Sequence, residues 1–293
     1  MTQTSDQLTN PKAERVRRVA QLARRAGRER AGRFVAEGPQ AVREAVAAHS
    51  TSGDVVHDLY VTTHATTRWA DELDAARAAG VAPRLVSDDV MAAMTDTITP
   101  QGLLAVCRLL DLPLDEVLRA ADPSALVTVL SHVRDPGNAG TVLRASDAAG
   151  AGAVVLTEAS VDVHNPKCVR STAGSLFHLP VSQGATLVDT VGALRERGLV
   201  VLAADGAGEV DLDDLQDAAE SDETALLRRP TAWLFGNEAW GLSAEHRDLA
   251  DAVVRVPLRG AAESLNLAMA ATVCLYASSR AHRRHPRIGR QSR

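Results

Sequence analysis

Residues 131–157 read SHVRDPGNAGTVLRASDAAGAGAVVLT, and this stretch decides the fold. The apolar run before it stops at the polar turn Asp135-Pro136-Gly137, which predicts the end of a strand. Asn138 is a good N-cap, so we expect a helix to open there. The apolar run AVVLT at 153–157 predicts the next strand. Strand, helix and strand in succession are typical of an alternating α/β series.

The same alternation continues on both sides of this stretch. Apolar runs predict further strands in the C-terminal half, followed by a long last helix at about 264–284. The strands expected there are 125–131, 153–157, 199–204, 231–235 and 252–256. They are apolar throughout, as in a parallel sheet covered on both faces. Upstream, an amphipathic helix is expected at 12–31, with strands at 33–38, 55–63, 82–87 and 102–109 and helices at 39–49, 69–80 and 88–95.

Residues 112–123 (LPLDEVLRAADP) hold two prolines and no strand-like run, so we interpret them as a linker. The fold class is therefore α/β, with an N-terminal α/β sandwich at 1–111 and a parallel-sheet domain at 124–281. A basic tail at 282–293 follows.

Charge is segregated along the chain, although the formal net charge is only −5. Residues 12–33 carry nine Lys or Arg against two Glu, and the tail at 282–293 carries five Arg and no acid. The stretch 205–223 holds nine acids and no base. Basic patches of this kind bind phosphate backbones, but they are also typical of solvated helix faces, and both interpretations stay open. The aromatic content of 3% argues against a platform of stacked bases.

The chain has no apolar run of about 18 residues and no signal-like N-terminus, so we expect no membrane segment and a cytoplasmic location. Cys107, Cys168 and Cys274 are isolated from one another. They are predicted to be reduced, buried thiols rather than disulfides or zinc ligands, and no metal site is expected.

Three segments carry candidate chemistry. In the first, the amides of the helix that opens at Asn138 form a natural anion site, and Arg144 follows six residues later. Six residues correspond to about 240° of helical rotation, so spacing alone does not put the two side chains together. An ordinary cap and a surface Arg stay possible. In the second segment, TAWLFGNEAWGLS at 231–243, a strand runs into a glycine-containing loop at the edge where open α/β sheets bind ligands.

The third segment is VVRVPLRGAAESLNLAMAATVCLYASSR at 253–280. Ser264 starts the predicted last helix and is either a plain N-cap or a functional residue. Asn266 lies among Leu, Ala, Met and Val, and a buried Asn needs partners from a ligand or a neighbouring loop. The chain lacks GxGxxG after the first strand, GxxxxGK[ST], HExxH and GxSxG. Dinucleotide-binding, nucleotide-triphosphate and hydrolase functions therefore lose their best support.

Taken together and in order, DPGNAGTVLRASDAAGAG, LFGNEAWGLS and VPLRGAAESLNLAMAA closely resemble the three signature motifs of the SpoU/TrmH family of RNA ribose 2′-O-methyltransferases. NPKCVRSTAGSLFHLPV and TDTITPQGLLAV also resemble the family, so that the resemblance covers most of 88–280. The first hundred residues resemble, more loosely, a ribosomal-protein-like RNA-binding domain. The resemblance implies S-adenosylmethionine as cofactor, a deep trefoil knot in the C-terminal domain, and a homodimer.

The resemblance also implies roles for single residues. Arg144 would act on the ribose 2′-hydroxyl with Asn138 holding it, and Glu238, Ser264 and Asn266 would complete the site. The cofactor wall would consist of Leu234, Phe235, Gly236, Val256, Leu258 and Leu265. The family's usual assignment makes the Arg a general base, but a guanidinium group holds its proton firmly. We therefore favour electrostatic stabilisation of the developing oxyanion, with water or a phosphate oxygen taking the proton.

Large-subunit ribosomal RNA is the favoured substrate, since the extra N-terminal domain is typical of family members acting there, and transfer RNA stays open. The basic segment 12–33, the N-terminal domain and the tail would contact the RNA backbone. Two rival functions remain. One is a non-catalytic RNA-binding or ribosome-assembly protein that keeps the fold, and the other is an α/β enzyme acting on a small nucleotide-like substrate.

Overall fold

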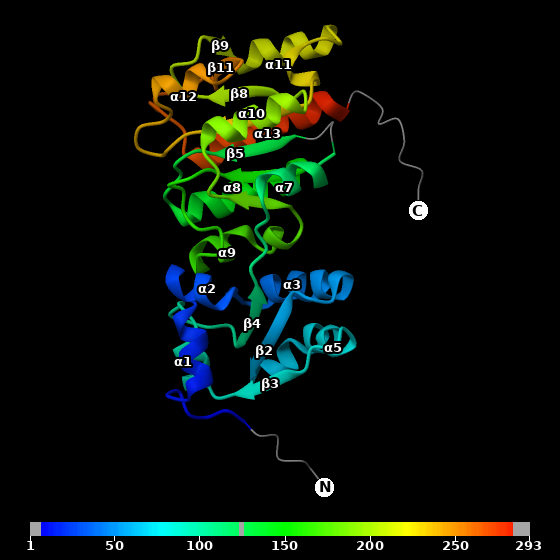
Figure 1. The fold of residues 1–293 in the computed structure, drawn as a ribbon, viewed down its shortest axis with the longest axis vertical. Helices are drawn as coiled ribbons and strands as arrows, with labels where there is room; N and C mark the ends of the chain where they lie inside the picture. The colour runs from blue at the N-terminus through cyan, green and yellow to red at the C-terminus, as the bar shows by residue number, and fades with distance from the viewer. Residues whose placement is uncertain (1–6, 123–125, 284–293) are drawn as a thin grey trace. The chain divides into compact units, whose positions relative to one another are not determined.

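The computed structural model describes residues 7–122 and 126–283 (Figure 1). Its contacts divide the chain into two compact units. The first unit contains the chain up to Leu110 together with Asp162–His178, and the second contains Asp111–Val161 and the chain from Leu179 on.

The first unit is built on a four-stranded mixed sheet in the order β1-β4-β2-β3. Its strands are β1 Arg33–Glu37, β2 Val56–Thr62, β3 Pro83–Val86 and β4 Leu103–Arg108. Strand β4 is antiparallel to both of its neighbours, whereas β2 and β3 are parallel. The helices before and between the strands are α1 Glu14–Gln21, α2 Arg25–Ala31, α3 Pro39–Ser52, α4 Ala65–Arg68, α5 Ala70–Ala78 and α6 Asp88–Met94. The four predicted strands are confirmed.

The single helix expected at 12–31 is wrong, because the chain forms α1 and α2 with a turn between them. Val16, Val19 and Leu22 pack into the core of the first unit, whereas the buried residue of α2 is Arg28. Gly27 makes the tight turn possible, since a Cβ there would lie 2.0 Å from the carbonyl oxygen of Gln21. A straight helix could not bury both sets of side chains.

Residues 162–178 belong to the first unit although they follow two strands of the second. They contain α9 (Pro166–Thr172) and the 3-10 turn η1 (Ser175–Phe177). Arg28 forms a 2.6 Å ion pair with Asp162, and the two side chains are only 3% and 10% exposed. Burial would raise the pKa of the Asp162 carboxyl, but hydrogen bonds from His164 and Arg28 hold it well below its usual range. The predicted domain bounds placed residues 162–178 in the domain at 124–281, whereas the contacts of the structure place them in the first unit.

The second unit contains a seven-stranded parallel sheet in the order β7-β6-β5-β10-β8-β11-β9. The strands are β5 Val127–Leu130, β6 Ala153–Leu156, β7 Val181–Gln183, β8 Val200–Ala204, β9 Val210–Asp211, β10 Thr231–Phe235 and β11 Ala252–Arg255. The predicted α/β class and parallel sheet are confirmed. Sequence analysis missed β7 and β9, which are short edge strands without a long apolar run.

The helices of the second unit are α7 Leu114–Ala120, α8 Pro136–Ala149, α10 Leu187–Glu196, α11 Leu212–Ser221, α12 Ala244–Asp248 and α13 Leu267–Arg283, with the 3-10 turn η2 Leu226–Arg228. The expected linker at 112–123 therefore contains a helix. Pro113 is the residue before its first turn, and Val117 and Leu118 are buried in the core of the second unit. Residue 123 of that linker and residues 284–293 of the predicted tail lie outside the described residues.

All three cysteines are buried, as predicted. Across the two described ranges, no helix combines the length and apolar character needed to cross a membrane.

Candidate active site

The three candidate segments meet at the carboxyl end of the parallel sheet. Strands β5 and β10 are neighbours, with Leu130 opposite Phe235, so the loops that follow them leave the sheet at the same edge. The loop after β5 begins with Ser131 and continues with His132, whose φ of +55° lies in the left-handed region that side chains rarely adopt.

Helix α8 begins earlier than the sequence suggested. Its N-cap is Asp135, whose side chain accepts a 2.8 Å hydrogen bond from the amide of Asn138. The prediction that Asn138 is the N-cap is wrong, because Pro136 suits the first helical position and Asp135 satisfies the amide three residues on. Asn138 therefore lies in the first turn, with its side-chain amide available for other partners.

That amide joins the three segments in what we call the amide cluster, formed by Asn138, Glu238 and Asn266. Asn138 donates through Nδ2 to Oε1 of Glu238 at 3.3 Å. Asn266 donates through Nδ2 to Oδ1 of Asn138 at 3.1 Å. These residues are 100 and 128 positions apart in the chain, and hydrogen bonds hold them in one place.

Glu238 also fixes the loop that leads into α8. Its carboxylate accepts hydrogen bonds from the backbone amides of Arg134 at 3.3 Å and Asp135 at 3.2 Å. A carboxylate next to the first turn of a helix is further stabilised by the helix dipole. Glu238 thus positions the backbone from which Asn138 projects.

A second tie between the loops is one that sequence analysis missed. Asn237, which is only 6% exposed, donates through Nδ2 to the carbonyl oxygen of His132 at 2.7 Å and accepts from the amide of Ala239 at 2.8 Å. The backbone of Asn237 pairs with that of Gly241. A Cβ on Gly236 would lie 2.4 Å from the carbonyl carbon of Gly241, so only glycine fits there. An Asn inside a glycine-bounded loop was the signal that could have revealed this tie.

Two expectations for the third segment are wrong. Helix α13 begins at Leu267, so Ser264 does not start it, and Asn266 lies exposed before the helix rather than buried on it. The reason is that Oδ1 of Asn266 accepts the amide of Ala268 at 2.9 Å, which is how a capping side chain ends a loop. Asn266 does find a neighbouring loop as partner, through Asn138. Ser264 is exposed and has no hydrogen bond among the described residues.

Arg144 is exposed on α8 and, within the described ranges, its side chain makes neither an ion pair nor a hydrogen bond. Asn138 bonds to Glu238 and Asn266 instead of to Arg144. The guanidinium of Arg144 is therefore available to an incoming anion.

A cavity of about 450 Å³ adjoins the third segment. Val256, Leu258 and Leu265, which the resemblance assigns to the cofactor wall, are among the residues that line it. Leu234 and Phe235 do not, because their side chains are fully buried within β10, and Gly236 also lies outside the lining. The walls combine apolar groups with the carboxylate of Asp213, which is paired with Arg259. Apolar surface with a few polar groups fits S-adenosylmethionine, whose adenine has apolar faces and whose ribose and amino-acid parts carry polar donors and acceptors. The volume lies in the range of small-molecule sites, about 300–1,000 Å³.

Aromatic rings also lie near the amide cluster. Trp240 is 56% exposed, and the guanidinium of Arg134 lies 5.2 Å from its ring centre. His132 and His246 stack with ring centres 5.3 Å apart, and burial together with the charge of His132 lowers the pKa of His246. In the part of the chain that the structure describes, no group of three or more His, Cys, Asp or Glu could hold a metal ion.

Comparison with known proteins agrees with this geometry. Residues 125–276 match the model of the SpoU rRNA Methylase family, and residues 13–105 match that of the MRM3-like substrate binding domain. The chain is 33% identical to the 23S rRNA (guanosine(2553)-2'-O)-methyltransferase RlmP of Bacillus subtilis over 92% of this chain and 98% of the relative. It is also 33% identical to the 23S rRNA (uridine(2479)-2'-O)-methyltransferase of Streptomyces viridochromogenes, over 89% of this chain and 87% of the relative.

Solved structures show the same similarity. The SpoU methyltransferase AviRb from Streptomyces viridochromogenes, in complex with AdoMet, superposes with a TM-score of 0.77 at 30% identity, over 93% of this chain and 100% of that one. An AdoMet-bound rRNA methyltransferase from Sinorhizobium meliloti superposes with a TM-score of 0.77 at 29% identity, over 94% of this chain and 98% of that one.

Proposed function

Because the chain belongs to the SpoU rRNA methylase family, as the three motifs predicted, we propose that it transfers a methyl group from S-adenosylmethionine to a ribose 2′-hydroxyl of RNA. The observation that carries the proposal is the amide cluster, because it joins all three motif segments beside a cavity that fits the cofactor. A non-catalytic protein that only keeps the fold would have no need to retain this set of polar side chains.

When bound, S-adenosylmethionine supplies an electrophilic methyl group on a sulfonium. Val256, Leu258 and Leu265 would hold it against the loop before α13. Glu238 fixes the first turn of α8 through the amides of Arg134 and Asp135, and Asn138 is anchored from both sides. Arg144, which carries no acidic partner among the described residues, stabilises the negative charge that develops on the 2′-oxygen. The proton leaves to water or to a phosphate oxygen of the RNA.

The proposed substrate is 23S ribosomal RNA, which is the substrate named for both relatives above. This substrate implies action in the cytoplasm. Transfer RNA is the second candidate. The target nucleotide is not specified by contacts to sugar and phosphate, which carry no sequence information directly.

Two further parts of the proposal concern assembly. The exposed apolar side chains of α13, Met269, Val273 and Tyr276, support a homodimer, because contiguous exposed apolar surface is typical of interfaces. The trefoil knot implied by the resemblance would lie in the second unit, where β10 inserts between β5 and β8.

The first unit is proposed to hold the RNA. Its basic segment and its match to a substrate-binding domain support this role. Deleting residues 1–110 would expose α9 and leave the Asp162 carboxylate without Arg28, so a truncation does not test RNA binding alone. Charge substitutions on the first unit test the role without this damage.

The proposal is tested by mapping ribose methylation across total RNA from cells with and without the protein. We expect one or a few 2′-O-methyl positions in 23S rRNA to disappear and to return with the wild-type gene. A strain that carries Arg144→Ala is the control that separates loss of catalysis from loss of the protein. It should contain normal amounts of the protein but still lack the 2′-O-methyl group. An unchanged methylation map in the deletion strain would refute the proposal.

A further inference from the structure

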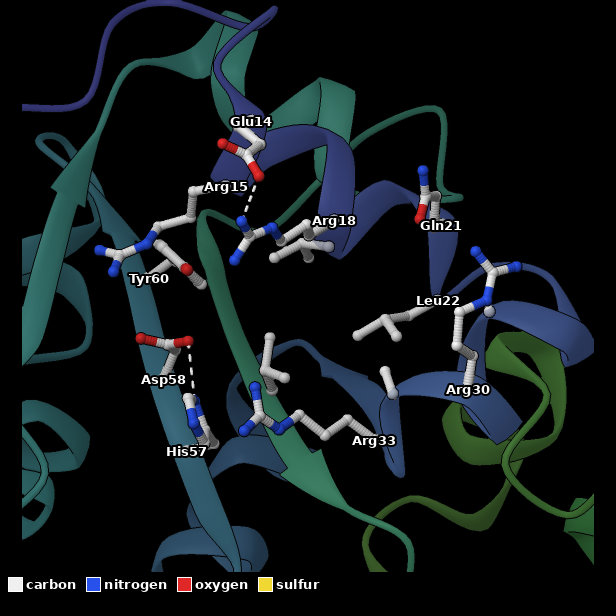
Figure 2. A pocket seen from close by; sticks show the side chains of 14 residues that line it. Glu14, Arg15, Arg18, Gln21, Leu22, Arg30, Arg33, His57, Asp58 and Tyr60 are labelled. Carbon is white, nitrogen blue, oxygen red and sulfur yellow. Dashed lines mark hydrogen bonds and ion pairs between the residues drawn. The ribbon is translucent and has the colours of Figure 1, made fainter.

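The first unit contains a second cavity, of about 510 Å³, far in sequence from the methyl-transfer motifs. It is enclosed by α1, α2, β1, β2 and β4, and all of its lining residues fall between Glu14 and Val106 (Figure 2). No role in the proposed methyl transfer has been given to it.

Arginines dominate the polar lining. Arg15, Arg18, Arg30 and Arg33 come from both helices and from β1, and only Glu14 and Asp58 oppose them (Figure 2). Arg18 is paired with Glu14. Among the described residues, Arg15, Arg30 and Arg33 make no ion pair and no side-chain hydrogen bond. Guanidinium groups without a carboxylate partner are suited to a phosphate, which they bind through two parallel hydrogen bonds.

The floor of the cavity is apolar but contains one unsatisfied donor. Val19, Leu22 and Val106 supply apolar surface. Tyr60 is fully buried, and its hydroxyl has no hydrogen-bond partner within the described ranges. Burial, with the charge of Asp58 second, raises the pKa of Tyr60 to about 12, so the hydroxyl stays protonated and can donate at neutral pH. A buried polar group normally has a partner, so this hydroxyl is positioned to donate either to the neighbouring Asp58 carboxylate or to a ligand.

An acceptor lies next to this donor. Asp58 and Tyr60 are two positions apart on β2, so their side chains lie on the same face of the strand. The register irregularity of this strand lies before them, between Val56 and Asp58. The Asp58 side chain is 15% exposed and is held by His57 at 3.0 Å and Arg84 at 3.4 Å. The cavity therefore offers cations at its walls, apolar surface at its floor, and a hydroxyl donor beside a carboxylate acceptor.

We propose that this cavity binds one unstacked nucleotide of the RNA substrate. The arginines bind its phosphate, and its base packs against Leu22 and Val106. Tyr60 and Asp58 form hydrogen bonds with the polar edge of the base. The inference rests on the proposed function for the source of the nucleotide. A base inside a helical stack could not enter, since its faces are covered by its neighbours, whereas a bulged or looped base presents both a face and an edge. The volume suits a single nucleotide.

The test compares two RNA hairpins of equal length, one fully paired and one with a single bulged nucleotide. Binding of the full chain is measured by fluorescence anisotropy at one fixed salt concentration. We expect the wild type to prefer the bulged hairpin by about tenfold, the scale of one base–protein contact. Tyr60→Phe should cut this preference about fivefold, as for one lost hydrogen bond, and Arg15→Gln should do the same or more.

Arg17→Gln is the matched control. Arg17 is on the same helix, is exposed and does not line the cavity, so its loss removes the same charge. Arg17→Gln should weaken binding to both hairpins by the same factor and leave the preference for the bulged hairpin unchanged. Tyr60→Phe keeps the ring and removes no existing hydrogen bond, so its thermal unfolding should match the wild type.

A wild type without preference, or a full preference in both cavity variants, overturns the inference. Adenosine and guanosine monophosphate form a separate arm of the experiment. If either binds as tightly as the bulged hairpin, the cavity serves a free phosphorylated compound and the RNA assignment is wrong. Methyl transfer by the wild type to 23S rRNA is measured in parallel. Its absence refutes the proposed function, whereas its presence with unchanged cavity variants refutes only this inference.

Discussion

Asn138→Asp turns the central hydrogen bond of the amide cluster into a repulsion. The donor Nδ2 lies 3.3 Å from Oε1 of Glu238, and the substitution replaces it with a second carboxylate oxygen. The acceptor for Asn266 is kept, so the change is confined to one contact. If Glu238 positions Asn138 for catalysis, this variant should lose activity for two separable reasons.

The magnitudes follow from the geometry. Loss of the donor costs about 1 kcal/mol, or about fivefold in rate, and Asn138→Ala loses in addition the acceptor for Asn266, which costs about another fivefold. Two charges 3.3 Å apart repel by about 1.3 kcal/mol at the dielectric constant of water, which is the lower limit because Glu238 is exposed and Asn138 is half-buried. The repulsion adds a further factor of about nine. We therefore expect Asn138→Asp to be about 45-fold slower than the wild type and Asn138→Ala about 25-fold slower.

The double variant Asn138→Asp with Glu238→Gln tests the cause. It removes the repulsion and should recover most of the factor of about nine relative to Asn138→Asp. The assay is single-turnover transfer of tritiated methyl groups to a 23S rRNA transcript, with the cofactor Kd measured by calorimetry and folding checked by thermal unfolding. If Asn138→Asp is no more than about fivefold slower than the wild type, the loss expected for the donor alone, or if Glu238→Gln gives no recovery, the amide cluster is not the working geometry.

Five other variants probe separate parts of the second unit. Arg144→Lys keeps a positive charge and should retain a fraction of the turnover, about ten- to a hundredfold below the wild type, whereas Arg144→Ala should lose about a thousandfold. Complete loss in the Lys variant, with RNA and cofactor binding intact, would mean that charge alone does not explain the role of Arg144. Gly236→Ala forces a Cβ to 2.4 Å from the carbonyl carbon of Gly241 and should lower the Tm by several degrees in calorimetry. Leu265→Asp, at a position 39% exposed, should leave the Tm unchanged but weaken cofactor binding at least about tenfold in titration calorimetry. Because the folded state lowers the pKa of His246 below 6.5, the unfolded chain binds that proton more tightly, so the Tm should fall as the pH drops from about 7 to about 5; His246→Gln should reduce this slope.

Elements with a strong local signal could be predicted from the sequence. The apolar run at 231–235 coincides with β10, and the run at 153–157 exceeds β6 by one residue. Both could be predicted because a strand that is buried on both faces is apolar along its whole length. Edge strands such as β9 carry no such run and depend on their neighbours. The start of α8 was predicted at Asn138, and Pro136, which suits the first helical position, was the signal that could have moved it to Asp135.

The contacts within the site could not be predicted in this way. That Asn138 lies against Glu238 and Asn266 follows from the sheet order, in which β10 is next to β5. No spacing in the sequence encodes that order. The resemblance named all three residues, but it paired Asn138 with Arg144, whereas the described contacts of Asn138 are to Glu238 and Asn266.

The basic run at 12–33 shows how structure divides charges that composition counts as one group. Arg28 is 2% exposed and is occupied by Asp162 and by the carbonyl oxygens of Leu22 and Ala23, so it stabilises the fold and cannot meet a phosphate. Arg15, Arg30 and Arg33 surround a cavity without acidic partners among the described residues, so their charge is available to a ligand. Two interpretations of this run, as a solvated helix face and as a phosphate-binding patch, were left open by the sequence. Each is incomplete. The same run contains a buried structural arginine and a set of arginines arranged around a cavity, and the buried arginine should not contribute to the salt dependence of RNA binding.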